Sequence, residues 1–190
     1  LFAGTTENGY RSSDYGDTWD EILQGVGICC LFINSTGHLF AGDFGGNIFR
    51  SMDDGENWEM FSTGGSAKVK SFVENKFGDL FVALPGSGVF RSTDNGENWI
   101  AINNGLDNLQ TYSVVANASD ELFTCVYGIG VYRSSNWGEN WEELNDGLTD
   151  HNVQFLLIDD AGYVYAGTEF NVFRSVQPTT DIKEIVHEVP

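Results

Sequence analysis

The segment Ser12-Ser-Asp-Tyr-Gly-Asp-Thr-Trp19 decides the fold, because it recurs three more times along the chain. The later copies are Ser51-Met-Asp-Asp-Gly-Glu-Asn-Trp58, Ser92-Thr-Asp-Asn-Gly-Glu-Asn-Trp99 and Ser134-Ser-Asn-Trp-Gly-Glu-Asn-Trp141. The four tryptophans are 39, 41 and 42 residues apart. A fixed period of this size indicates stacked supersecondary units, each of which buries its apolar faces against its neighbours. The chain is therefore predicted to be a repeat protein.

Each repeat contains four short apolar runs separated by turn residues. In the third repeat, we expect strands over residues 69–75, 80–84, 89–93 and 98–102. Short runs rich in Val, Ile, Phe and Trp between Gly, Asn and Asp are typical of antiparallel hairpins. No window has the sustained spacing of three and four that predicts a helix. Four strands in about 40 residues correspond to one propeller blade, so the predicted fold is an all-β β-propeller of four-stranded antiparallel blades.

The recurring turn has a structural explanation. Asp and Ser oxygens accept hydrogen bonds from nearby backbone N–H groups and so close a turn. Glycine permits a positive φ at the tip, and the Trp is expected to open the fourth strand as an apolar anchor. The predicted structural residues are Ser12, Asp14, Gly16 and Trp19; Ser51, Asp53, Gly55 and Trp58; Ser92, Asp94, Gly96 and Trp99; and Ser134, Asn136, Gly138 and Trp141. Asn136 keeps the acceptor without the charge, as turn closure requires.

Five blades are expected, over about residues 1–25, 26–66, 67–107, 108–150 and 151–186, within a propeller domain of residues 1–176. The first is expected to lack its inner strand and the last its turn motif. We expect residues 177–190 to supply a last outer strand, at 182–186, and a linker toward a missing C-terminal region. The absence of an initiator Met or signal peptide favours a fragment of a longer protein. A five-bladed ring and an arc of a six- to eight-bladed ring both remain open.

These turns resemble Asp-boxes, the BNR repeats of the sialidase superfamily, and the resemblance covers residues 1–176. Similar repeats occur in sortilin-like receptors, xyloglucanase-like glycoside hydrolases and photosystem assembly factors. The resemblance implies a propeller whose turns lie on the face opposite the ligand. It does not imply one activity, since many functions share this scaffold.

Composition excludes several functions. The chain has 28 acidic and 9 basic residues and a formal net charge of −19, which argues against nucleic acid and anionic membranes as partners. No apolar run is long enough for membrane insertion. The three cysteines and three histidines lack metal-ligand spacing, and no phosphate loop occurs, so no metal or cofactor is expected. On a regular strand Cys29 and Cys30 point to opposite faces, and Cys125 is expected to be buried.

Arginine decides against sialidase activity. Sialidases hold the substrate carboxylate with three arginines, whereas all five arginines here occupy one repeat position before the turn motif. We expect them to pair with acids of the same or the adjoining blade. These residues are Arg11, Arg50, Arg91, Arg133 and Arg174.

The candidate ligand-binding face is formed by two sets of loops. Inter-blade loops carry Lys68, Asp107, Gln110, Asp150, His151 and Asn152, and loops between second and third strands carry Asp43, Phe44, Pro85, Tyr127, Glu169 and Phe170. The predicted ligand-binding residues are Phe44, Tyr127, Phe170, Asp107, His151 and Asn152, because aromatic rings on loops suit sugar rings or peptide side chains. The alternative is that the rings fold back over the blade edge.

The expected function is a non-catalytic extracellular or cell-surface recognition module that binds glycan or protein. One alternative is a fragment of a xyloglucanase-like glycoside hydrolase, with an acid pair among Asp43, Asp107, Asp150 and Glu169; another is a scaffold for assembly of a protein complex. Residues 177–190 resemble the segment before the sorting domains of secreted bacterial proteins, which favours a secreted or cell-surface location. The oligomeric state is left open.

Overall fold

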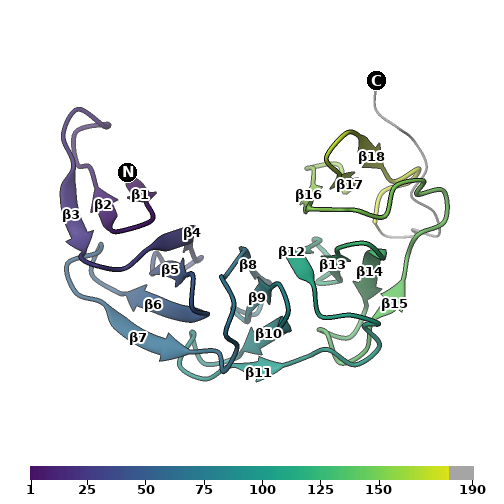
Figure 1. Ribbon diagram of the computed structural model, residues 1–190, viewed down its shortest axis with the longest axis horizontal. Coiled ribbons are helices and arrows are strands. Elements are labelled where there is room, and N and C mark those ends of the chain that lie inside the picture. The colour runs from purple at the N-terminus through teal and green to yellow at the C-terminus, as the bar shows by residue number, and fades with distance from the viewer. Residues whose placement is uncertain (180–190) are drawn as a thin grey trace.

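The computed structural model describes residues 1–179, and all the regular secondary structure of these residues is β-strand. Five antiparallel sheets follow one another along the chain and stand side by side around an open arc (Figure 1). The first and last sheets have three strands among the described residues and the other three sheets have four. This arrangement confirms the prediction of an all-β propeller with five blades, of which the first and last are incomplete. No helix of this part of the chain meets the length and apolarity needed to cross a membrane.

The strands of each blade are consecutive in sequence. The first blade has β1 (Phe2–Gly4), β2 (Gly9–Arg11) and β3 (Asp20–Leu23), and the second has β4 (Ile28–Ile33), β5 (Leu39–Asp43), β6 (Asn47–Ser51) and β7 (Glu59–Ser62). The third has β8 (Ser71–Glu74), β9 (Leu80–Leu84), β10 (Gly88–Ser92) and β11 (Ile100–Ala101). The fourth has β12 (Thr111–Ala116), β13 (Leu122–Val126), β14 (Gly130–Ser134) and β15 (Glu142–Glu143), and the fifth has β16 (Phe155–Ile158), β17 (Val164–Gly167) and β18 (Val172–Arg174). The predicted outer strand at 182–186 lies outside the described residues.

The inner strands β4, β8, β12 and β16 line the concave side of the arc, and the outer strands β7, β11 and β15 lie on its convex side (Figure 1). The second strand of a complete blade is buried on both faces, because a neighbouring blade covers each face. Every residue of β9 and β13 is buried. This burial explains why β9 is continuously apolar rather than alternating. In β13 the one polar residue is Thr124, whose hydroxyl donates to the Ser113 carbonyl at 2.9 Å.

The four repeat turns (residues 12–19, 51–58, 92–99 and 134–141) share one hydrogen-bond pattern. In the third, the Ser92 hydroxyl donates to the Asp94 carboxylate at 2.8 Å and accepts from the Gly96 N–H at 2.8 Å. The Asp94 carboxylate also accepts from the Asn98 N–H at 2.9 Å. Equivalent bonds occur in the other three turns. Gly96 has a φ of 85°, as predicted, and Asn95 before it has a φ of 58°, the pair of left-handed residues typical of a tight hairpin turn.

The fourth turn, which has Asn136 in place of the aspartate, shows which hydrogen bonds of the aspartate are needed to close the turn. Asn136 Oδ1 accepts from the Ser134 hydroxyl at 2.9 Å and from the Asn140 N–H at 3.0 Å. In the third turn the second carboxylate oxygen of Asp94 also accepts from the Asn98 side chain at 2.7 Å. An amide has no second oxygen for that bond. The fourth turn therefore closes with a neutral side chain. In the other three turns, the second carboxylate oxygen of the aspartate adds one bond, to the side chain of the Asn or Thr four residues later.

Each tryptophan of the repeat turns lies directly before the fourth strand, so the prediction that it opens the strand is wrong by one residue. Its ring packs toward the preceding blade: Trp58, Trp99 and Trp141 belong to three successive apolar clusters between blades. Trp141 is only 4% exposed, and its indole N–H donates to the Ile102 carbonyl of the third blade at 2.6 Å. Trp19 has no blade before it among the described residues and is 42% exposed.

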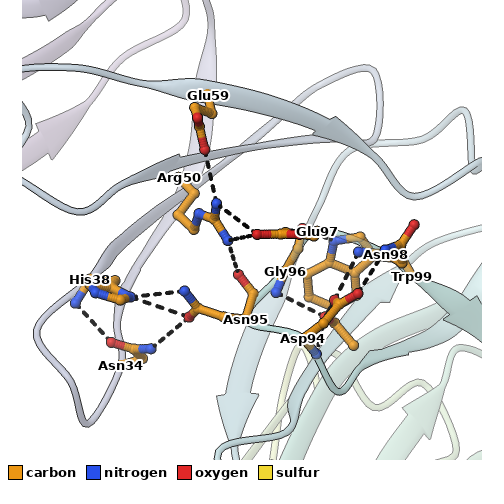
Figure 2. A network of polar contacts seen from close by, with 11 residues as sticks. Asn34, His38, Arg50, Glu59, Asp94, Asn95, Gly96, Glu97, Asn98 and Trp99 are labelled. Carbon is orange, nitrogen blue, oxygen red and sulfur yellow. Dashed lines mark hydrogen bonds and ion pairs between the residues drawn. The ribbon is translucent and has the colours of Figure 1, made fainter.

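Arginines at the end of the third strands tie blades together. Figure 2 shows Arg50 reaching from β6 toward Glu59 of its own blade and toward Asn95 and Glu97 of the next. Its guanidinium is 2.8 Å from the Asn95 carbonyl oxygen, 2.9 Å from Glu59 and 3.4 Å from Glu97, and its side chain is 4% exposed. Arg11 similarly pairs with Glu56 of the second blade at 2.7 Å. Arg91 and Arg133 pair with Asp79 and Glu121 of their own blades.

Candidate ligand-binding face

One position at the start of the inner strands repeats around the concave side of the arc. It is the position directly before the inner-strand residue that pairs with the end of the second strand, where Gly42, Ala83, Cys125 and Gly167 lie. In the second to fifth blades it is occupied by Cys29, Lys70, Tyr112 and Gln154, respectively. The Lys70 and Gln154 N–H groups make equivalent bonds, to the Ala83 and Gly167 carbonyls at 2.9 and 2.8 Å. This position therefore brings a thiol, an amine, a phenol and an amide to the same end of successive blades. It adjoins the loops in which sequence reasoning placed the ligand.

The amine and the phenol of neighbouring blades meet. The ammonium nitrogen of Lys70 lies 5.3 Å from the centre of the Tyr112 ring, which is within the range of a cation–π contact. The Tyr112 ring stacks in turn on Tyr127, with centroids 5.4 Å apart and an interplanar angle of 29°. Tyr127 is 41% exposed. We call Lys70, Tyr112 and Tyr127 the tyrosine–lysine cluster.

The charge of this cluster is unusual for the chain. The ion pairs found within residues 1–179 involve five basic residues: Arg11, Arg50, Lys76, Arg91 and Arg133. Lys68 and Lys70 take part in no ion pair of that part of the chain, and both are exposed. In a chain with a net charge of −19, this places a local positive charge beside an aromatic surface.

The predicted aromatic residues differ in their surroundings. Tyr127 belongs to the tyrosine–lysine cluster. Phe44 is 48% exposed and its ring lies over Gly27, where a Cβ would come within 2.9 Å of the ring. Phe170 is 80% exposed at the tip of the loop between β17 and β18. Among the predicted aromatic residues, Tyr127 is joined by ring stacking to Tyr112, and through it to Lys70.

The predicted polar residues are mostly engaged within the protein. Asp107 accepts a 2.7 Å hydrogen bond from the hydroxyl of Tyr132, whose ring is buried. Burial, together with the bond to Asp107, raises the pKa of Tyr132. The His151 ring lies 3.0 Å from the Leu148 carbonyl oxygen, and the Asn152 N–H donates to Asp150 at 3.0 Å.

Two of the other carboxylates considered for catalysis, Asp43 and Asp150, also serve their own loops, whereas Glu169 is exposed in the loop between β17 and β18. Asp43 accepts from the N–H groups of Gly45 and Asn47 at 2.8 and 2.7 Å and so closes the β5–β6 turn. The Asn152 backbone N–H, followed by the Thr168 side chain, lowers the pKa of Asp150. Both carboxylates therefore act as turn acceptors in this structure.

Sequence reasoning missed Lys70, Tyr112 and Cys29, because it searched the loops and treated the inner strands as scaffold. Aligning the repeats on Gly42, Ala83, Cys125 and Gly167 places these residues in one column. The sequence therefore already contained the register that brings these chemically different side chains to one position of the blades.

No family model and no curated protein matches this chain, whereas many solved structures do. An ancestral GH74 enzyme aligns with a TM-score of 0.80 and 15% identity over 98% of this chain and 30% of that chain. The extracellular domain of a one-component system from B. thetaiotaomicron aligns with a TM-score of 0.77 and 14% identity, over 100% of this chain and 30% of that one. YCF48 bound to D1 peptide gives 0.71 and 12%, over 98% and 62%. The chain thus spans under a third of the first two structures, and the likeness shows the β-propeller fold alone.

Proposed function

We propose that the chain is a non-catalytic recognition module of an extracellular or cell-surface protein and that it binds a glycan or protein ligand at the tyrosine–lysine cluster. We also assign the four repeat turns to the Asp-box (BNR) type, because their Ser, Asp and Gly residues close the turns by local hydrogen bonds. The extracellular location is supported by the similarity to one protein of B. thetaiotaomicron, whose extracellular domain is the part that aligns.

The observation that carries the proposal is the stacked pair of tyrosines with an ammonium group beside it. A partly exposed aromatic face stacks on the apolar face of a sugar ring or on a flat peptide side chain. Lys70 adds a donor and a positive charge that no carboxylate of the described chain neutralises by an ion pair. We therefore expect the preferred ligands to present an acidic group next to an apolar ring.

The non-catalytic part of the proposal rests on the carboxylates. Glycoside hydrolysis needs two carboxyl groups about 5–9.5 Å apart across the scissile bond. Asp43, Asp107 and Asp150 each hold a turn or a tyrosine hydroxyl by hydrogen bonds. A scaffold role in assembly of a complex differs from our proposal in predicting a protein partner without glycan affinity.

The test is retention of the 190-residue chain on immobilised neutral and uronic-acid polysaccharides and on a peptide array, with reducing ends measured in parallel. We expect retention without cleavage. Tyr127→Ala should abolish retention because it removes the exposed aromatic face, and Lys70→Ala should weaken it about tenfold, since a hydrogen bond to a charged group contributes about 1.5–3 kcal/mol. Tyr15→Ala is the matched control, because Tyr15 is 97% exposed at the tip of a repeat turn. New reducing ends, or retention that Tyr127→Ala leaves unchanged, contradicts the proposal. Binding to neither surface also contradicts it.

A further inference from the structure

Cys29 and Cys30 lie at the start of β4, where the strand has a β-bulge. Ile28 pairs with Asp43 and Cys30 pairs with Gly42, so Cys29 is the extra residue. Adjacent side chains of a regular strand point to opposite faces, but a bulge interrupts this alternation. The prediction that the two thiols point to opposite faces is wrong for this reason.

Both sulfur atoms lie next to Gly42. The Cys29 sulfur is 3.2 Å from the Gly42 carbonyl oxygen, 3.0 Å from that of Asp43 and 3.2 Å from that of Val69. The Cys30 sulfur occupies space that a side chain at Gly42 would need, because a Cβ there would lie 2.8 Å from it. The glycine thus leaves room for the Cys30 thiol beside Val69, and the Cys29 sulfur contacts the carbonyl groups of Gly42 and Val69.

The two thiols also interact with each other. A hydrogen bond from Cys30 lowers the pKa of Cys29, and the same bond, with burial, raises the pKa of Cys30. Both side chains are half-buried, and Cys29 occupies the same repeat position as Lys70 and Tyr112 at the start of an inner strand.

We propose that Cys29 and Cys30 form a dithiol site that binds monosubstituted trivalent arsenicals. Thiolates are soft ligands that select soft, thiophilic centres. On binding, two sulfur–arsenic bonds form, two arsenic–oxygen bonds of the hydrated arsenical break, and each thiol proton leaves with a hydroxide as water. No atom changes its oxidation state, so the step needs no oxidant or reductant.

A bridging arsenic atom suits this pair better than a disulfide does. The peptide bond between the two residues is trans, which holds their Cα atoms about 3.8 Å apart. Disulfides usually join Cα atoms about 4.4–6.8 Å apart. An inserted arsenic atom lengthens the sulfur–sulfur separation and removes this constraint.

The experiment treats the reduced 190-residue chain with phenylarsine oxide and measures the intact mass in excess glutathione. A chelate resists a monothiol and is reversed by dithiothreitol, so we expect one glutathione-resistant adduct per chain. We expect Cys29→Ser to lose this adduct and Cys125→Ser to keep it, because Cys125 is fully buried and far from the pair in sequence. Circular dichroism verifies that each variant is folded.

Peptide mapping of the wild-type adduct makes the result independent of the variants. Arsenic on the peptide that contains Cys29 and Cys30 supports the site. Three results overturn it: no glutathione-resistant adduct on the wild-type chain, an adduct mapped elsewhere, or an undiminished adduct on folded Cys29→Ser. None of these readouts depends on glycan or protein binding, so the dithiol site and the proposed function fail separately.

Discussion

Truncation of Trp141 tests whether the tryptophans of the repeat turns stabilise the protein through contact with the preceding blade. Trp141 is 4% exposed, within a cluster that includes Phe81 of the preceding blade and Val114 of its own blade. Its indole N–H donates to the Ile102 carbonyl of the preceding blade at 2.6 Å. A tryptophan buries about 150–250 Å², which at about 25 cal/mol per Å² corresponds to about 4–6 kcal/mol. Large-to-small changes of buried aromatics cost about 3–5 kcal/mol. We therefore expect Trp141→Ala to lower the free energy of unfolding by about 4 kcal/mol.

Trp19→Ala is the matched control, because it removes the same residue from the same position of the repeat. Trp19 is 42% exposed, so the same area arithmetic gives a smaller loss of about 2–3 kcal/mol. Urea unfolding followed by far-UV circular dichroism measures the free energy of unfolding of both variants. If this free energy falls by about 2 kcal/mol per M of urea, the unfolding midpoint of the Trp141 variant should lie about 2 M below that of the wild type. Equal losses in the two variants, or a larger loss for Trp19→Ala, would refute the argument that inter-blade burial decides the contribution of each tryptophan.

Two further predictions concern the polar contacts of the blades. Arg50→Lys should destabilise the protein by about 2 kcal/mol in the same urea assay, because an ammonium group cannot bridge the Asn95 carbonyl, Glu59 and Glu97 as the guanidinium does. Arg11→Lys is the control, because the Arg11 side chain is 24% exposed, and it should cost less than about 1 kcal/mol. A larger loss for Arg11→Lys than for Arg50→Lys would show that burial does not decide the contribution of these arginines. The Thr18 side-chain hydroxyl, followed by its backbone N–H, lowers the pKa of Asp14 from 3.8 to about 2, so its folded-state pKa lies below its unfolded-state pKa. The stability from this carboxylate is therefore present above about pH 4 and lost as the pH falls toward about 2. Thermal unfolding should show a smaller loss over this range for Asp14→Asn, which keeps the acceptor that Asn136 uses; identical pH profiles would contradict the assignment.

The candidate site was predictable only in part. Tyr127 was identified from its loop position, and the structure places it in the tyrosine–lysine cluster. Lys70 and Tyr112 were missed, although they lie in the same column of the aligned repeats as Cys29. Asp107 was predicted to bind ligand or to belong to an acid pair, but it accepts a hydrogen bond from Tyr132, which is 25 residues away in sequence. A partner at that separation leaves no local pattern in the sequence.

The sequence by itself determined the blades and their turns. The bonds that close a repeat turn join residues two to four positions apart, such as Ser92 to Asp94 and Gly96, and local bonds produce a local motif that recurs with the period. The structure alone decided which side chains of different blades meet, because the contact of Lys70 with Tyr112 depends on how two neighbouring blades pack. It also decided the direction of the Cys29 and Cys30 thiols, because a bulge changes the register of β4 without a distinctive residue to announce it. Alternation and period are properties of one chain segment, whereas packing and register depend on its neighbours.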